Sequence, residues 1–183
     1  MPELQELNMD DIHDMMTDPG MRAEKQAEDT MPTGTYTAKP ADRVAAFKQE
    51  EVDGDGTPLG TERIFIRFGG NAKRADGSHA GRYSFMASPM KRHNKPDKNG
   101  RVRLDNASAL WADILGAFKL DETTPVGMVV EAAKAYEFRV KIAQIFKTTE
   151  GWRTAKDADD AKQYIEQGFE PRSVVRSIYP AKA

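Results

Sequence analysis

The segment from residue 61 to residue 68 alternates apolar and basic side chains, and this pattern predicts a strand with two unlike faces. Its first face carries Ile64, Ile66 and Phe68, and we expect these side chains to join the core. Its second face carries an aromatic ring between two cations: Arg63, Phe65 and Arg67. Such a face is typical of a half-exposed sheet that binds a ligand rather than of a plain solvated surface.

Two blocks of opposite charge lie behind a formal net charge of only −2. Residues 1–30 carry nine acids against two bases, and residues 63–103 carry eleven bases against two acids. The asymmetry predicts a polyanionic partner for the basic block. A soluble domain with one fortuitously basic edge is the alternative that charge alone leaves open.

The length of 183 residues suits one domain plus a tail. Leu, Ile, Val and Phe together make only about 17% of the chain, which predicts a small core with long loops. We therefore expect an acidic, flexible tail over residues 1–30 and a single domain over 31–183. The absence of cysteine excludes disulfides and thiolate metal sites. Without an apolar run of membrane-spanning length, we expect a soluble, cytoplasmic protein with no membrane partner.

The first half of the domain reads as three strands. Residues 35–39 begin a strand that Pro40 interrupts and that continues over residues 43–48. The second strand covers residues 61–68 and should end at Gly69-Gly70. The third covers residues 82–87, with Tyr83 and Phe85 on one face. The basic segment 91–101 lacks large apolar residues, which predicts an exposed loop with a turn at Asn99-Gly100.

The second half mixes helices and strands. Asp105 or Asn106 can cap a helix that runs through Leu120 and buries Leu110, Trp111, Ile114, Leu115 and Phe118. Residues 126–135 fit a short helix or a strand, and the pattern does not separate the two. Further along the chain we expect a strand over 137–147, a hairpin partner over 152–155, a helix over 157–167 and a strand over 173–178.

Three strands, a helix and two more strands follow one another in the five-stranded Greek-key barrel that binds oligonucleotides. The sequence thus predicts a mainly β fold of this type, with a helix after the third strand and a C-terminal helix and strand as an extension. In that fold the exposed face of the second and third strands holds single-stranded nucleic acid.

The chain resembles phage-encoded single-stranded-DNA-binding proteins of the oligonucleotide-binding (OB) fold over roughly residues 31–155. The segments that carry the resemblance are Pro32-Thr33-Gly34-Thr35-Tyr36, Arg63 to Phe68, Gly81-Arg82-Tyr83 and Phe138 to Ile145. The resemblance implies binding of single-stranded DNA in replication or recombination, within the host cytoplasm. Bacterial-type members recruit protein partners through an acidic C-terminal tip, whereas this chain carries its acidic segment at the N-terminus. We expect the acidic residues 1–30 to compete with nucleic acid for the basic block, and docking of a separate protein partner by this segment is the alternative.

We expect lysine and arginine to neutralise phosphates while aromatic rings stack on bases, with DNA as the first expectation and RNA left open. The residues assigned to this role are Arg63, Phe65, Arg67, Lys73, Arg74, Arg82, Tyr83, Phe85, Lys91, Arg92, Lys95, Arg101, Arg139 and Lys141.

Catalysis, a metal and a cofactor are not expected, because the three histidines lie far apart and no phosphate-binding glycine motif is present. Two other functions remain open at this point. The first is a structural or assembly module, such as a virion component, and the second is a small nucleic-acid-processing enzyme whose acids converge only in the fold.

Overall fold

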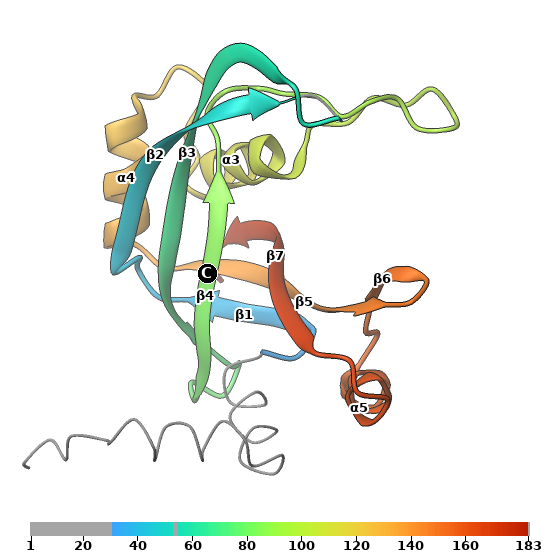
Figure 1. The fold of residues 1–183 in the computed structure, drawn as a ribbon. Helices are drawn as coiled ribbons and strands as arrows, with labels where there is room; N and C mark the ends of the chain where they lie inside the picture. The colour runs from blue at the N-terminus through green and yellow to red at the C-terminus, as the bar shows by residue number, and fades with distance from the viewer. Residues whose placement is uncertain (1–30, 53–54, 183) are drawn as a thin grey trace, which may run out of the picture.

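The computed structural model describes residues 31–52 and 55–182, so the expected acidic tail over residues 1–30 lies outside the described residues. The described chain forms an antiparallel sheet of seven strands together with three helices (Figure 1). The elements are β1 (Gly34–Ala38), β2 (Arg43–Val52), β3 (Pro58–Lys73), β4 (His79–Ala87), α3 (Asn106–Ala117), α4 (Val126–Ala135), β5 (Phe138–Thr148), β6 (Gly151–Thr154), α5 (Ala158–Glu166) and β7 (Pro171–Pro180).

The long strand β3 organises half of the sheet. Its residue Gly69 pairs with β2 on one side and with β4 on the other, and Ala72 pairs with β1 on one side and again with β4 on the other. Strands β1 and β2 therefore follow one another along the same edge of β3. The break between them falls at Pro40, as the sequence predicts, because proline has no N–H to donate to a ladder.

Strand β5 organises the other half. It pairs with β1 and β6 along one edge and with β7 along the other, in every case antiparallel. The two halves cross at a steep angle, which Figure 1 shows for β3 and β5. Strands β4 and β7 approach each other, and α3 packs against both, but no hydrogen-bonded ladder joins them. The sheet is therefore open, and the closed five-stranded barrel that the sequence predicts is not confirmed.

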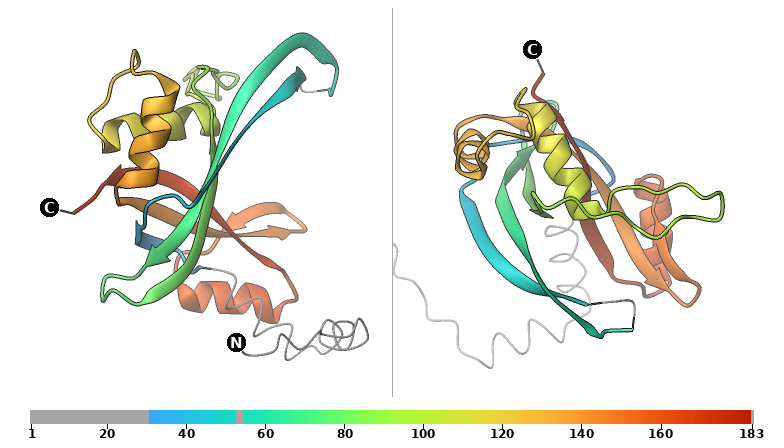
Figure 2. Two further views of the ribbon diagram at one scale, coloured as in Figure 1. Left: turned by 90° about the vertical axis from the view of Figure 1, so that its left-hand side faces the viewer. Right: turned by 90° about the horizontal axis from the view of Figure 1, so that it is seen from above.

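The main core lies between the sheet and the two helices α3 and α4 (Figure 2). Aromatic rings form its centre: Phe68 stacks on Phe85, and Phe138 meets both Phe85 and Tyr83 edge-on. Of the predicted stripe, Leu110, Trp111, Ile114 and Leu115 are buried on α3, whereas Phe118 is the C-cap residue and is partly buried against the core. A second, smaller cluster forms where Phe146 of β5 packs against Tyr164 of α5.

N-cap residues mark the starts of two of the helices. The carboxylate of Asp105 accepts the backbone N–H of Ser108, which confirms this residue as the N-cap of α3. That helix ends at Ala117, three residues before the predicted end at Leu120. Asp157 caps α5 in the same way, through the N–H of Asp160. Residues 126–135 form the helix α4, which decides between the two readings that the sequence left open.

Strand β3 is longer than predicted, because Gly69-Gly70 does not end it. Gly69 pairs with both β2 and β4, Gly70 pairs with β4, and neither glycine has a positive φ. Gly70 lies against the ring of Tyr83, so the missing side chain makes room for that ring rather than a turn. None of the described helices is long and apolar enough to cross a membrane.

Candidate nucleic-acid interface

The outward face of β2 and β3 carries a partly exposed aromatic pair flanked by cations. Phe47 and Phe65 are register partners, and their rings stack with centroids 5.7 Å apart and planes 20° apart. The guanidinium of Arg67 lies 5.8 Å from the centroid of the Phe47 ring, and that of Arg63 lies 5.0 Å from the centroid of the Phe65 ring. Both rings are partly exposed and the Arg67 side chain is exposed. We name Phe47, Phe65 and Arg67 the aromatic face.

A second outward row crosses four strands at the other end of β3. Register places Lys73 of β3 beside Thr37 of β1, Thr37 beside Arg139 of β5, and Arg139 beside Tyr179 of β7. Directly opposed residues of a ladder share one face, so all four side chains point the same way. The Arg139 guanidinium lies 5.8 Å from the centroid of the Tyr179 ring and donates to the carbonyl of Pro180. The predicted residues Lys73 and Arg139 thus belong to one row, and Lys141 lies exposed next to it.

Several lysine and arginine residues that the sequence analysis assigned to nucleic-acid binding form ion pairs with carboxylates. Arg82 donates to both carboxylate oxygens of Asp42 and also to Asn71, which lowers the pKa of Asp42. Lys73 lies 3.5 Å from a carboxylate oxygen of Glu137. Arg74 sits in the β3–β4 turn and donates to the carbonyl of His79 rather than to a carboxylate. Of the predicted basic residues on the sheet, Arg67 and Lys141 are exposed and have no ion pair among residues 31–52 and 55–182.

The prediction that Tyr83 and Phe85 stack on bases is wrong. Tyr83 is only 1% exposed and Phe85 only 5%, since both point from β4 into the main core. The phenol of Tyr83 donates to the carbonyl of Lys39 at 2.7 Å, and burial raises the pKa of this phenol. The two residues do share one face, as predicted, but the antiparallel register places Phe85 opposite the core residue Phe68.

The prediction that Arg63 contacts nucleic acid is also wrong, because its side chain is buried. Its guanidinium donates to the Asp105 carboxylate at 2.9 Å, to Ser108 at 2.7 Å and to Ser88 at 3.1 Å. Strand β4 stops pairing at Ile66, so the segment after β4 and the start of α3 cover Arg63. Burial alone would raise the pKa of Asp105, but the hydrogen bonds from Arg63 and Ser108 outweigh it and lower that pKa. Arg63 is therefore held by these partners, with its guanidinium over the Phe65 ring.

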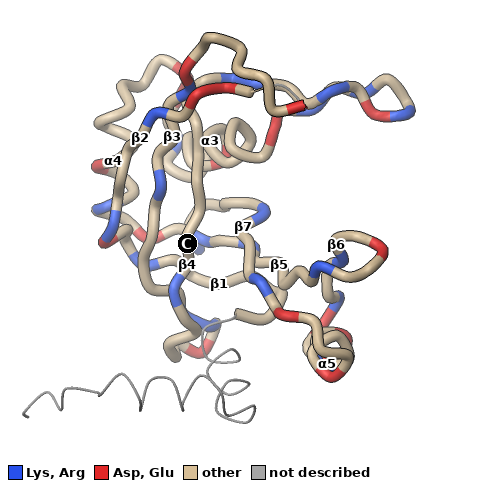
Figure 3. The backbone as a smooth tube through the Cα atoms, viewed as in Figure 1, with Lys and Arg blue, Asp and Glu red and all other residues tan. Residues whose placement is uncertain are grey.

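The remaining predicted bases lie on the segment 91–104, which we name the basic arm. Figure 3 shows this arm projecting from the body with several Lys and Arg residues along it. The arm carries Lys91, Arg92, Lys95, Lys98, Arg101 and Arg103, against one acid, Asp97. Lys91 pairs with Glu122 and Arg92 pairs with Glu51, whereas Lys95 and Arg101 are exposed. The structure therefore separates the predicted site into a sheet surface and an arm.

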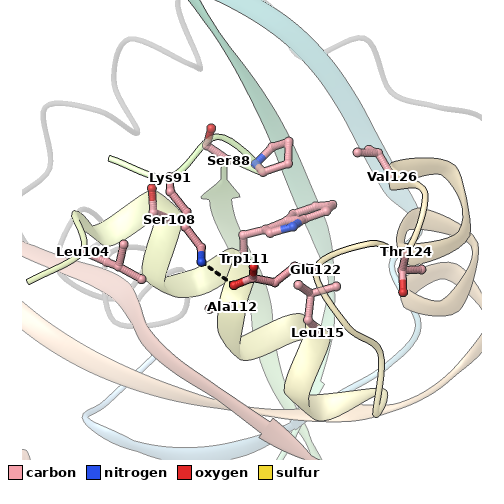
Figure 4. A pocket seen from close by; sticks show the side chains of 11 residues that line it. Ser88, Lys91, Leu104, Ser108, Trp111, Ala112, Leu115, Glu122, Thr124 and Val126 are labelled. Carbon is pink, nitrogen blue, oxygen red and sulfur yellow. Dashed lines mark ion pairs between the residues drawn. The ribbon is translucent and has the colours of Figure 1, made fainter. Parts of the chain in front are cut away.

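A pocket of about 240 Å³ lies beside the start of the arm, on the helix side of the molecule. Pro89, Trp111, Leu115 and Val126 give it an apolar lining, and the Lys91–Glu122 ion pair crosses it (Figure 4). This ion pair ties the arm to the connection between α3 and α4. The pocket is separate from the aromatic face, and Lys91 is the one residue of its lining that the sequence analysis assigned to nucleic-acid binding.

Sequence reasoning missed Phe47 as a site residue. The segment 43–48 gives only a short strand pattern, and its single aromatic residue is no stronger a signal than any other phenylalanine. Phe47 becomes informative once the hairpin register places it directly beside Phe65. Trp152, 51% exposed on β6 opposite Lys147, is a second exposed ring that the sequence analysis left unassigned.

Comparison of the chain with protein family models, with curated proteins and with solved structures gives no match. In the part of the chain that the structure describes, no group of three or more His, Asp or Glu side chains has the geometry to hold a metal ion.

Proposed function

We propose that the protein binds single-stranded DNA on the aromatic face of β2 and β3. The observation that carries this proposal is the partly exposed Phe47–Phe65 pair with the exposed guanidinium of Arg67, which has no ion pair among residues 31–52 and 55–182, beside the Phe47 ring. Rings of this kind accept an unpaired base by stacking, which is worth about 1–3 kcal/mol per base and tolerates any sequence. The base of a duplex is not accessible for such stacking, so the face favours single strands.

The buried Arg63 supports this role indirectly. Its hydrogen bonds to Asp105, Ser108 and Ser88 hold its guanidinium over the Phe65 ring, and that ring stacks on Phe47. A preorganised stacking surface loses less conformational entropy when a base binds. Arg63 is thus a positioning residue of the interface, and the exposed Arg67 is the cation that meets a phosphate.

The pairing of the strands supports an OB-like architecture. If β1 and β2 together count as one bent first strand, then β3, β4, β5 and β7 are the second to fifth strands. The first strand pairs with the second and the fourth, the second with the third, and the fourth with the fifth. In the OB fold the ligand face is that of the second and third strands, here β3 and β4. The outward side of this region includes Phe65, Arg67 and, opposite Arg67, Met86.

A binding series with matched oligonucleotides tests the proposal. Full-length protein should bind single-stranded DNA without added metal and more tightly than a blunt duplex of the same sequence. Its affinity should fall with salt, with a log–log slope of about −0.7 for each phosphate contacted. An RNA oligonucleotide of the same sequence determines whether the sugar matters. Equal or tighter binding of the blunt duplex, or salt-independent binding, would overturn the proposal.

A further inference from the structure

The basic arm is a preformed two-stranded projection. Its two sides are joined by the bridge between His93 and Leu104 and by the hydrogen bond from the N–H of Asn94 to the carbonyl of Arg103. At its tip the Asp97 carboxylate accepts the N–H groups of Asn99 and Arg101, which closes the turn. Figures 1 and 2 show the arm standing away from the sheet and the helices.

The base of the arm is fixed to the body at several points. Arg92 donates to both carboxylate oxygens of Glu51 on β2, at 2.6 and 2.9 Å, and the backbone N–H of Arg92 donates to Ser108 on α3. On the other side, the N–H of Asp105 donates to the carbonyl of Arg92. These contacts fix the orientation of the arm relative to β2 and α3, so its lysine and arginine side chains lie at a defined position.

The chemistry of the arm differs from that of the aromatic face. The arm contains no Phe, Tyr or Trp, so it offers little surface for base stacking. Lys95, Lys98, Arg101 and Arg103 are exposed and, within the described part of the chain, have no ion pair. Lysine and arginine side chains without aromatic neighbours bind phosphates, and phosphates are densest on a duplex.

The arm starts next to the aromatic face. Arg63, which lies over the Phe65 ring, donates to the carbonyl of Met90 just before the arm and to Asp105 just after it. A strand that stacks on Phe65 and then continues into a duplex therefore brings that duplex to the arm. We infer that the basic arm binds the phosphates of duplex DNA and that the protein prefers sites where a single strand continues into a duplex. This inference rests on the proposed single-strand binding.

Three DNA ligands test the inference with full-length protein: a single strand, a blunt duplex and a duplex with a single-stranded tail of either polarity. The tailed duplex should bind more tightly than the single strand alone. If the arm contacts three duplex phosphates, the log–log salt slope for the tailed duplex should be steeper than that for the single strand by about 2.7.

Charge removal on the arm should abolish this preference. The variant Lys95→Gln/Lys98→Gln/Arg101→Gln should bind the tailed duplex at least about tenfold more weakly than the parent protein at low salt. Its log–log salt slope for the tailed duplex should fall to the slope for the single strand. Its affinity for the single strand should change less than about threefold, because only long-range attraction is lost. The matched control, Lys156→Gln/Lys162→Gln/Arg172→Gln, removes the same charge from exposed positions near α5 and β7 and should keep the preference.

A label at the arm tip locates the arm directly. The chain has no cysteine, so Asn99→Cys provides a single labelling site on an exposed turn. Energy transfer from this label should be stronger to a dye on the duplex end of the tailed ligand than to one on the free single-stranded end. The reverse order, or equal salt slopes for the tailed duplex and the single strand, would overturn the role of the arm while leaving single-strand binding intact. Loss of single-strand binding with duplex binding retained would instead overturn the proposed function.

Discussion

Gly70 and Tyr83 are register partners on β3 and β4, and the glycine makes room for the tyrosine ring. A Cβ atom at Gly70 would lie 2.6 Å from the phenol oxygen of Tyr83 and 2.8 Å from the ring carbon that carries it. The phenol cannot easily withdraw, because it is buried and donates to the carbonyl of Lys39. The glycine thus allows an aromatic residue to serve as core where the sequence suggests a binding surface.

We expect Gly70→Ala to destabilise the fold by about 1–3 kcal/mol, the usual cost of overpacking a core. Gly69→Ala is the matched control, since its Cβ would meet nothing closer than the backbone oxygen of Tyr83 at 3.5 Å, an ordinary contact. Urea unfolding of the two variants gives the comparison. Equal stability of the two would show that the Tyr83 ring does not occupy this position.

The buried Arg63 should matter for stability rather than through direct contact with DNA. Replacement by Met leaves the partly buried carboxylate of Asp105 without its main partner, which should cost about 2–4 kcal/mol. The control Arg67→Met alters an exposed side chain and should stay within about 0.5 kcal/mol of the parent in the same denaturation experiment. If both variants were equally stable, the hydrogen-bond network around Arg63 would not contribute to the free energy of unfolding.

Acid should destabilise the protein partly through Glu51. The hydrogen bonds from Arg92 and then Thr61 lower the pKa of Glu51 from 4.5 to about 2 in the folded state. A lowered folded-state pKa adds stability above the unfolded pKa, and that stability is lost as the pH falls from about 4.5 towards 2. Glu51→Gln should therefore lower the melting temperature at pH 7 and differ little from the parent near pH 2.

The control for this experiment is Glu50→Gln, an exposed neighbour that has no ion pair within the described residues. Its melting temperature should follow the parent at every pH. A constant difference between Glu51→Gln and the parent from pH 7 to pH 2 would contradict the assigned pKa.

The sequence predicted most strands and helices because their signals are local. Alternation marked β3 and β5, and the cap candidate Asp105 marked the start of α3. The burial of Arg63 was not predictable, since its partner Asp105 lies 42 positions away in the sequence. For Tyr83 and Phe85, alternation showed that they share a face, but only the register against Phe68 shows that this face is the core. Phe47 was missed for the same reason, because its role in the aromatic face depends on its register position beside Phe65.

The paired effects of Phe65→Ala and Arg67→Ala on single-strand binding test the central claim most directly. Removal of the Phe65 ring should weaken binding by about 1–3 kcal/mol while leaving the salt slope unchanged, because stacking releases no counterion. Removal of the Arg67 charge should flatten the log–log slope by about 0.7. Circular dichroism must show both variants folded, and Phe47→Ala should repeat the result of Phe65→Ala. Folded variants that bind single-stranded DNA with the affinity and salt slope of the parent would contradict the account.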